Sequence, residues 1–338
     1  MPDDGAEANS DEANSDELNS HEATGWRNVR RGVVVLILIV AAIVLAYVRS
    51  GSAVVVTQAI VTGLLTGGVY GLVAMGLTLI FGVLDIVNFA HGAFLALALF
   101  VTFWLVTSLG IHPYLVLAIS IPVMFGIGFV VQRWVLAGAM GKPLENQLLI
   151  TLGISLVIEN ALLMFFGGNP RSVRLSGDHA IPIFGAVADL SRVLAFVGAL
   201  ALAAGLYLLL QRTRLGTAIR AVATNDVGAQ LVGIDTRLIY AITFAIGTAC
   251  AGAAGTLVAP LVTIEPTTGA LFNIIAFVVV VLGGMGNVIG ALVGGLIIGL
   301  TEQLGGIYLP GQSPLLSVFI VFVLVLFLRP QGLFGRSA

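Results

Sequence analysis

The chain has 338 residues, of which 58% are hydrophobic and only 9% are charged. Soluble domains usually carry about 25% charged residues, so this composition excludes a water-soluble globular protein and predicts a chain embedded in a lipid bilayer. The formal net charge is −2, and no basic stripe with interleaved aromatic residues appears, which argues against a nucleic-acid partner.

The N-terminal tail, residues 1–31, is acidic, because eight of the 17 acids lie within the first 22 residues. Its apolar content is too low to bury a core, so we expect the tail to be disordered. A solvating extension is the simpler interpretation, and a regulatory or partner-binding arm is the alternative. Residues 32–53 are predicted to form an extra N-terminal transmembrane helix, and residues 54–334 the main domain.

Ten apolar segments are candidates for membrane helices, since a span needs about 20 apolar residues to cross about 30 Å of hydrocarbon. They are 33–48, 54–80, 89–109, 114–136, 148–166, 193–210, 238–262, 272–282, 288–304 and 315–328. Segment 272–282 would rise only about 16 Å as a helix before a glycine-rich stretch interrupts it. Broken helices are tolerated only inside protein or beside a water-filled cavity, and they point to a transport pathway.

Residues 79–92 resemble this later break, because both stretches combine an apolar run, a glycine or polar interruption, an asparagine and a helix of small residues. The similarity predicts two structural repeats, one on each side of a polar loop at residues 211–237. The expected fold is an all-α polytopic membrane protein with about ten transmembrane or half-membrane helices in two related halves.

Basic residues predict the orientation of these helices, because cytoplasmic loops are enriched in Lys and Arg. If the N-terminus is cytoplasmic and every segment crosses, eleven basic residues fall inside and four outside. We therefore expect a multi-pass protein of the cell membrane, with both termini and the polar loop in the cytoplasm.

The polar loop carries the signals of a short helix. Asn225 is a favourable N-cap, Asp226 suits the positive end of the helix, and Gly233 suits a left-handed stop. An ordinary basic connector is the alternative, but connectors are usually short. The length of this loop therefore favours a docking element for a soluble partner.

Three motifs resemble the permeases of branched-chain amino acid ABC importers. The first lies at residues 76–82 with Asn88-Phe89-Ala90-His91-Gly92, the second is the coupling loop at residues 214–221 and 229–235, and the third lies at residues 281–287 with Gly290-Ala291. The resemblance covers roughly residues 54–334 in the same order. It implies the ABC importer permease fold, while the acidic tail and the first span are additions to it.

The resemblance also implies partners and a division of labour. A second related permease, two cytoplasmic ABC ATPases and an extracytoplasmic solute-binding protein would complete the importer. The sequence has no G-x-x-x-x-G-K-[ST] phosphate loop, so we expect no enzyme activity and no cofactor in this chain, with ATP and Mg²⁺ used by the ATPases. The expected cargo is a branched-chain amino acid or a related small amino acid or amide.

Candidate site residues fall into three groups. Coupling to the ATPase is assigned to Arg214, Gly216, Thr217, Arg220, Asn225, Ala229, Leu231 and Gly233. The translocation pathway is assigned to polar groups and breaks at membrane depth, where an ionised residue costs about 2.5–3.5 kcal/mol: Asn88, His91, Glu159, Gly284, Asn287 and Glu302. The alternative for His91 is a bond to the backbone, and the alternative for Glu159 and Glu302 is pairing across helices. Docking of the binding protein is assigned to Arg171 and Arg174, with salt bridges to Asp178 and Asp189 as the alternative.

Two other functions are open to such a chain. An ion-coupled secondary transporter would use a membrane-buried carboxylate, for which Glu159 and Glu302 are available. An intramembrane enzyme would need His91, Ser155 and Asp85 to meet at depth, and no motif places them together. Four histidines and one cysteine show no metal-ligand spacing, so no metal site is predicted.

Overall fold

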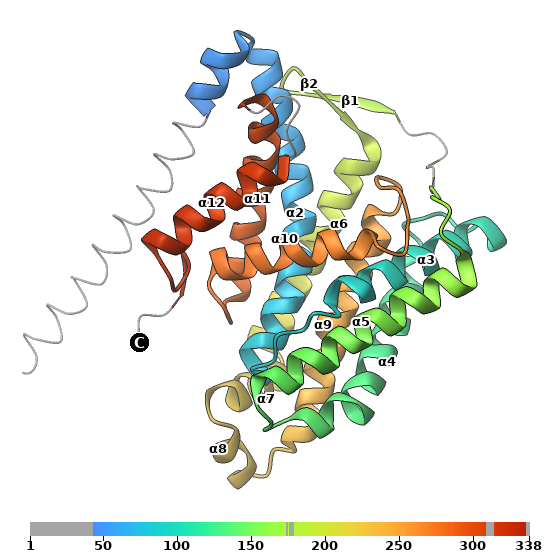
Figure 1. Ribbon diagram of the computed structural model, residues 1–338, viewed down its shortest axis with the longest axis vertical. Helices are drawn as coiled ribbons and strands as arrows, with labels where there is room; N and C mark the ends of the chain where they lie inside the picture. The colour runs from blue at the N-terminus through green and yellow to red at the C-terminus, as the bar shows by residue number, and fades with distance from the viewer. Residues whose placement is uncertain (1–42, 174, 176–178, 309–313, 336–338) are drawn as a thin grey trace, which may run out of the picture. The chain divides into compact units, whose positions relative to one another are not determined.

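The computed structural model describes residues 43–173, 175, 179–308 and 314–335 (Figure 1). The acidic tail at residues 1–31, most of the predicted first span, and Arg174 with Asp178 lie outside the described residues. The chain divides into two compact units, Met1–Val56 and Thr57–Ala338. Every side-chain contact discussed below belongs to the second unit.

The described part of the second unit is built almost entirely from helices. They are α2 (Ala53–Leu84), α3 (His91–Leu109), α4 (Leu117–Trp134), η1 (Leu136–Ala139), α5 (Leu144–Phe166), α6 (Leu190–Arg212), α7 (Arg214–Thr224), α8 (Asp226–Leu231), α9 (Thr236–Val258), α10 (Thr268–Gly283), α11 (Val288–Tyr308) and α12 (Pro314–Leu328). In the described residues, seven helices are long and apolar enough to span a bilayer, and α10 and α12 are shorter apolar helices. The prediction of an all-α polytopic membrane protein is confirmed.

The nine predicted apolar segments from residue 54 onward each correspond to one of these helices. Helix α10 begins at Thr268, four residues before the predicted segment 272–282, so its 16 residues rise about 24 Å rather than 16 Å. Thr268 and Gly269 carry no apolar side chain, so hydrophobicity alone does not reveal this first turn of the helix. Of the predicted first span, only residues 43–48 are described, and they are helical.

The connection between α5 and α6, which carries Arg171, contains a β-hairpin that was not predicted from the sequence. Strand β1 (Ala180–Ile183) pairs antiparallel with β2 (Ala186–Asp189). Phe184 and Gly185 between them both have positive φ angles, 51° and 84°, as a two-residue type I′ turn requires. Gln58 of α2 fixes the hairpin, since its side chain donates to the Val187 carbonyl at 2.7 Å and accepts from the Val187 amide at 2.8 Å.

Helices α2 and α9 form the buried centre, whereas α4, α5 and α6 turn much of their apolar surface outward. Glycines let α2 and α11 approach closely, as small residues do in membranes. A Cβ atom at Gly67 would lie 2.8 Å from the Gly295 carbonyl oxygen. The glycines Gly63, Gly67 and Gly71, spaced four residues apart on α2, therefore pack against the backbone of α11.

Figure 1 shows α7 and α8 at the opposite end of α6 from the β1–β2 hairpin. If α6 spans the membrane, these two polar regions lie on opposite sides of it. This arrangement separates the predicted coupling segment from the predicted docking surface for a binding protein.

Candidate functional site

The first helix break, residues 85–90, joins α2 to α3 and is buried at Ile86, Asn88 and Ala90, while Asp85 and Phe89 are exposed. The Asn88 side chain is fully buried, and its Oδ1 accepts from the Ala90 amide at 3.1 Å, while its Nδ2 has no partner. Nε2 of His91, also fully buried, lies 3.0 Å from the Val73 carbonyl oxygen. Asn88 thus holds the backbone of the break, whereas His91 ties the start of α3 to the middle of α2. Each keeps one unused polar atom, since His91 Nδ1 is also unpartnered.

The second helix break, residues 284–287, joins α10 to α11 through a turn made by two glycines. Gly284 and Gly286 have φ angles of 97° and 82°, which L side chains rarely adopt. Asn287 Oδ1 accepts from the Gly290 amide at 2.9 Å and caps α11, and its Nδ2 donates to the Phe334 carbonyl at 3.1 Å. The last turn of α2 approaches this second break, because a Cβ atom at Gly82 would lie 2.9 Å from Gly286 Cα.

An open hollow of about 570 Å³ lies between α3, α5, α10 and α12. Its walls are mostly apolar, and Phe89 of the first break contributes to them. Three polar residues, Ser155, Glu159 and Asn273, also line it. The Ser155 hydroxyl donates to Glu159 Oε1 at 3.2 Å, and no cation lies within ion-pair distance of Glu159 among the described residues.

Glu302 lies elsewhere, at the packed contact of α11 with α2. Its carboxylate interacts with the Tyr70 hydroxyl of α2, and Glu302 Oε2 is buried without a hydrogen-bond partner. Of the six predicted pathway residues, only Glu159 lines the hollow. Asn88 and His91 lie at the first break, and Gly284 and Asn287 lie at the second.

The polar loop at residues 211–237, here called the coupling segment after its predicted role, contains two helices, α7 and α8. The sequence predicted only one. Helix α8 is confirmed in its details, since Asn225 Oδ1 accepts from the Gly228 amide at 2.8 Å and Gly233 has a φ angle of 86°. Helix α7 was missed as a separate element. It is strongly amphipathic and buries Ile219 and Val222, a periodicity that the sequence already carried.

The predicted coupling residues divide into exposed and buried groups. Exposed are Arg214, Thr217, Arg220, Asn225, Leu231 and Gly233, while Gly216 and Ala229 are buried. Gly216 packs on the Leu209 and Leu210 carbonyl oxygens, so a larger residue would push α7 away from α6. Gly216 and Ala229 therefore hold the segment in place, and the exposed residues are the ones available to a partner.

Arg171 is engaged within the chain. Its guanidinium lies 4.9 Å from the centroid of the Phe103 ring and 5.8 Å from that of Phe166, and Nη2 donates to the Phe166 carbonyl. The Arg171 backbone also pairs with Ile264. This geometry gives Arg171 a packing role and leaves its predicted docking role without structural support. The alternative partner Asp189 instead lies 3.7 Å from Arg192.

Asn273 is the residue that sequence reasoning overlooked. From α10 it donates through Nδ2 to the Phe89 carbonyl at 3.1 Å and accepts through Oδ1 from the Gly92 amide at 3.2 Å. It therefore links α10 to the first break and lines the hollow as well. A lone amide inside an apolar segment was the available signal, because a polar group at membrane depth needs a partner.

The side chains required for an intramembrane enzyme are not assembled. His91 binds the Val73 carbonyl, Ser155 binds Glu159, and Asp85 is exposed. Among the described residues, no group of three or more His, Cys, Asp or Glu side chains is placed to hold a metal ion. The hollow around Glu159 therefore combines a few polar groups with apolar walls, a geometry suited to binding a solute rather than to covalent chemistry.

Comparison with known families gives one match that covers most of the chain. The family model described as branched-chain amino acid transport system / permease component matches residues 59–328. No solved structure matches the chain significantly.

Two similar curated proteins are permeases. The high-affinity branched-chain amino acid transport system permease protein BraD of Pseudomonas aeruginosa is 32% identical over 293 residues, which cover 82% of this chain and 95% of BraD. The corresponding permease protein LivH of Escherichia coli strain K12 is 30% identical over 301 residues, again 82% of this chain and 95% of the relative.

Proposed function

The chain belongs to the permease family of branched-chain amino acid transport systems, and from that premise we propose that it is the membrane-spanning subunit of an ATP-driven importer. Two cytoplasmic ABC ATPases supply the work, an extracytoplasmic binding protein delivers the solute, and a second related permease completes the pathway. The proposed cargo is a branched-chain amino acid, which the names of both relatives specify for those proteins.

The observation that carries this proposal is the apolar surface of the coupling segment. Val227, Leu231 and Val232 are 62%, 85% and 77% exposed, although they follow directly on a polar stretch outside the predicted spans. Contiguous exposed apolar side chains on such a surface mark a protein contact. With both termini and this segment in the cytoplasm, the natural partner is an ATPase.

Helix α8 is held firmly enough to pass on a partner's motion. A helix of six residues is unstable by itself, so its fixed place depends on contacts with its neighbours. Ala229 on its inner face is buried, and the Tyr240 hydroxyl of α9 interacts with Asp226 in its first turn. Through Gly216, α7 is seated on the end of α6. A displacement of the coupling segment therefore moves the ends of α6 and α9.

The hollow around Glu159 suits one side of the solute pathway. Its apolar residues, such as Leu152, Leu156 and Phe277, match a branched aliphatic side chain, and the Glu159 carboxylate matches an ammonium group. The hollow is open on one side, where Leu152 and Leu156 are exposed. The second permease is proposed to close it there, which excludes water and strengthens the ion pair.

Coupling is tested by Leu231→Asp in the full chain co-expressed with candidate ABC ATPases of the same genome. A central apolar anchor of an interface contributes about 2 kcal/mol or more, so we expect ATPase recovery with the tagged permease to fall about 30-fold. Phe184→Asp is the matched control, because Phe184 is 94% exposed on the hairpin turn at the other end of α6. Normal recovery with Leu231→Asp refutes the coupling assignment.

The pathway is tested separately by Glu159→Gln, measured as ATP-dependent leucine uptake into vesicles that hold the assembled importer. Loss of a charged hydrogen bond of about 1.5–3 kcal/mol predicts at least about tenfold slower uptake, with ATPase recovery unchanged. Glu145→Gln, an exposed acid in the first turn of the same helix, serves as control. Equal uptake by both variants would remove Glu159 from the pathway while leaving the coupling proposal intact.

A further inference from the structure

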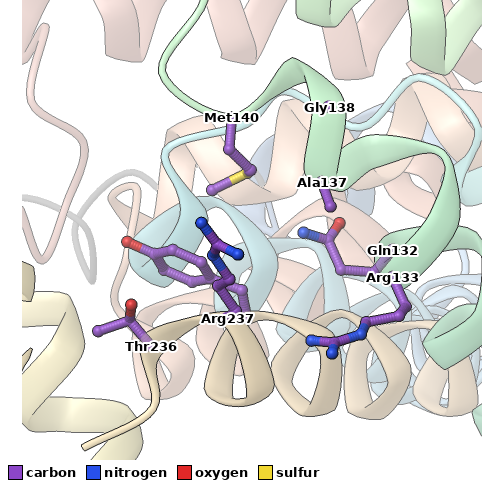
Figure 2. A pocket seen from close by; sticks show the side chains of 8 residues that line it. Gln132, Arg133, Ala137, Gly138, Met140, Thr236 and Arg237 are labelled. Atoms are coloured by element: carbon purple, nitrogen blue, oxygen red, sulfur yellow. The ribbon is translucent and has the colours of Figure 1, made fainter.

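A second hollow, of about 540 Å³, lies where α4 and η1 meet the first turn of α9. Its lining includes Gln132, Arg133, Met140, Arg237 and Tyr240. Figure 2 shows the Gln132 amide and the Arg237 guanidinium directed toward the same space beneath the Met140 side chain, with Arg133 at its lower edge. This basic hollow is separate from the apolar hollow around Glu159 and shares no lining residue with it.

The basic hollow has two positive charges and no acid among its lining residues. Within the described part of the chain, neither Arg133 nor Arg237 forms an ion pair. Asp226, which interacts with the Tyr240 hydroxyl, does not line the hollow, and neither does Asp235, whose Oδ1 accepts from the Leu238 amide. Two guanidinium groups beside one concave space match the geometry of phosphate oxygens, which accept several N–H bonds at once.

Gln132 adds an independent sign of a missing ligand. Its side chain is only 2% exposed, and Oε1 is buried with no hydrogen-bond partner. A flip of the Gln132 amide, whose nitrogen lies on the side of Arg237 in Figure 2, would turn this acceptor into the hollow, where an occupant with a hydroxyl donor would pair with it. The hollow thus offers two donors for a phosphate and one acceptor for a hydroxyl group.

The surroundings favour a lipid as the source of this phosphate. Trp134, the last residue of α4, is 78% exposed beside the hollow's Arg133, and tryptophan is enriched at membrane–water interfaces. Basic pockets between membrane helices on the cytoplasmic side bind anionic headgroups. Placement on the cytoplasmic side rests on the orientation in the proposed function.

We propose that the basic hollow binds the headgroup of an anionic phospholipid that carries a free hydroxyl, such as phosphatidylglycerol. Arg133 and Arg237 donate to the phosphate, and Gln132 accepts from the hydroxyl. Thr236 and Arg237 form the first turn of α9, directly after α8 and Gly233. A bound headgroup therefore ties α4 to the start of α9 and steadies the helix that receives motion from the coupling segment.

Binding is measured on the full chain in detergent, without ATPases, by titrating phosphatidylglycerol or phosphatidylcholine and counting bound lipid by native mass spectrometry. At about 1 kcal/mol for each arginine, Arg133→Gln/Arg237→Gln weakens phosphatidylglycerol binding about 30-fold. The matched pair Arg212→Gln/Arg220→Gln removes the same charge from exposed positions outside the hollow and leaves binding within about twofold. The proposal is overturned if both double variants lose affinity for phosphatidylglycerol equally, or if the unmodified chain binds phosphatidylglycerol and phosphatidylcholine equally well.

Two further arms identify the ligand. Phosphatidic acid lacks the headgroup glycerol with its hydroxyl. We therefore expect Gln132→Leu to lower the preference for phosphatidylglycerol over phosphatidic acid by about fivefold. An unchanged preference overturns the role of Gln132. Soluble glycerol phosphate competes only weakly if the lipid is the ligand, whereas competition at equal affinity shows that a free phosphate ester occupies the same site. Because no ATPase is present, failure here is distinct from failure of the coupling assignment.

Discussion

Each of the two helix breaks contains an asparagine, but the breaks are stabilised in different ways. At the first break, distant side chains bind the backbone: Asn273 of α10 holds Phe89 and Gly92, and Thr151 of α5 donates to the Val87 carbonyl at 3.2 Å. At the second break, glycines with positive φ angles make the turn, and the C-terminal backbone at Leu333 donates to the Leu282 carbonyl at 2.8 Å. A buried break needs polar side chains from elsewhere, whereas a partly exposed one can be built from backbone.

The largest expected effect comes from Gly92→Val at the first break. A side chain at Gly92 would overlap the Gly269 carbonyl and lie 2.7 Å from Asn273 Cβ, so α3 and α10 would have to separate. Overpacking of this kind costs about 3 kcal/mol, measured as the free energy of unfolding in detergent micelles. Gly153→Val on α5 is the control, since nothing lies within 4 Å of a Cβ atom there. Equal destabilisation of both variants would mean that the close approach is unimportant.

Asn273→Ala is expected to cost less, about 2 kcal/mol, because it removes two hydrogen bonds and leaves the buried Gly92 amide unpaired. Hydrogen exchange should accelerate at residues 87–92 and stay unchanged at residues 284–287, which distinguishes the two breaks directly. Asn160→Ala provides the control, because that amide bonds only to the Leu156 carbonyl of its own helix. Faster exchange at both breaks would contradict their separate stabilisation.

The smallest effect is expected for Asn287→Ala at the second break, about 1 kcal/mol, the usual cost of losing an N-cap. The Phe334 residue, whose carbonyl it binds, is 45% exposed, so water can replace the lost amide. The same unfolding assay therefore orders the two asparagine variants, with Asn273→Ala the more destabilising. The reverse order would show that the second break carries more of the stability.

Local signals allowed several parts of the site to be predicted. The cap at Asn225 and the left-handed Gly233 follow from the preferences of those residue types within a few positions along the chain. The same holds for the two breaks, where glycine and asparagine interrupt apolar runs. Asn273 was missed and Arg171 was assigned a surface role, because their partners Phe89 and Phe103 are 184 and 68 positions away in the numbering of the sequence.

The sequence by itself determined the membrane setting and the nine apolar segments from residue 54 onward, because the length and hydrophobicity of a span are properties of the chain alone. It also determined the family through its ordered motifs. Only the tertiary structure decided that Glu159 faces an apolar hollow, that Glu302 instead meets Tyr70, and that Arg237 lines the same hollow as Gln132 and Arg133. Helix periodicity shows which residues share a face of one helix, but the neighbour of that face is set by packing between segments far apart in the chain.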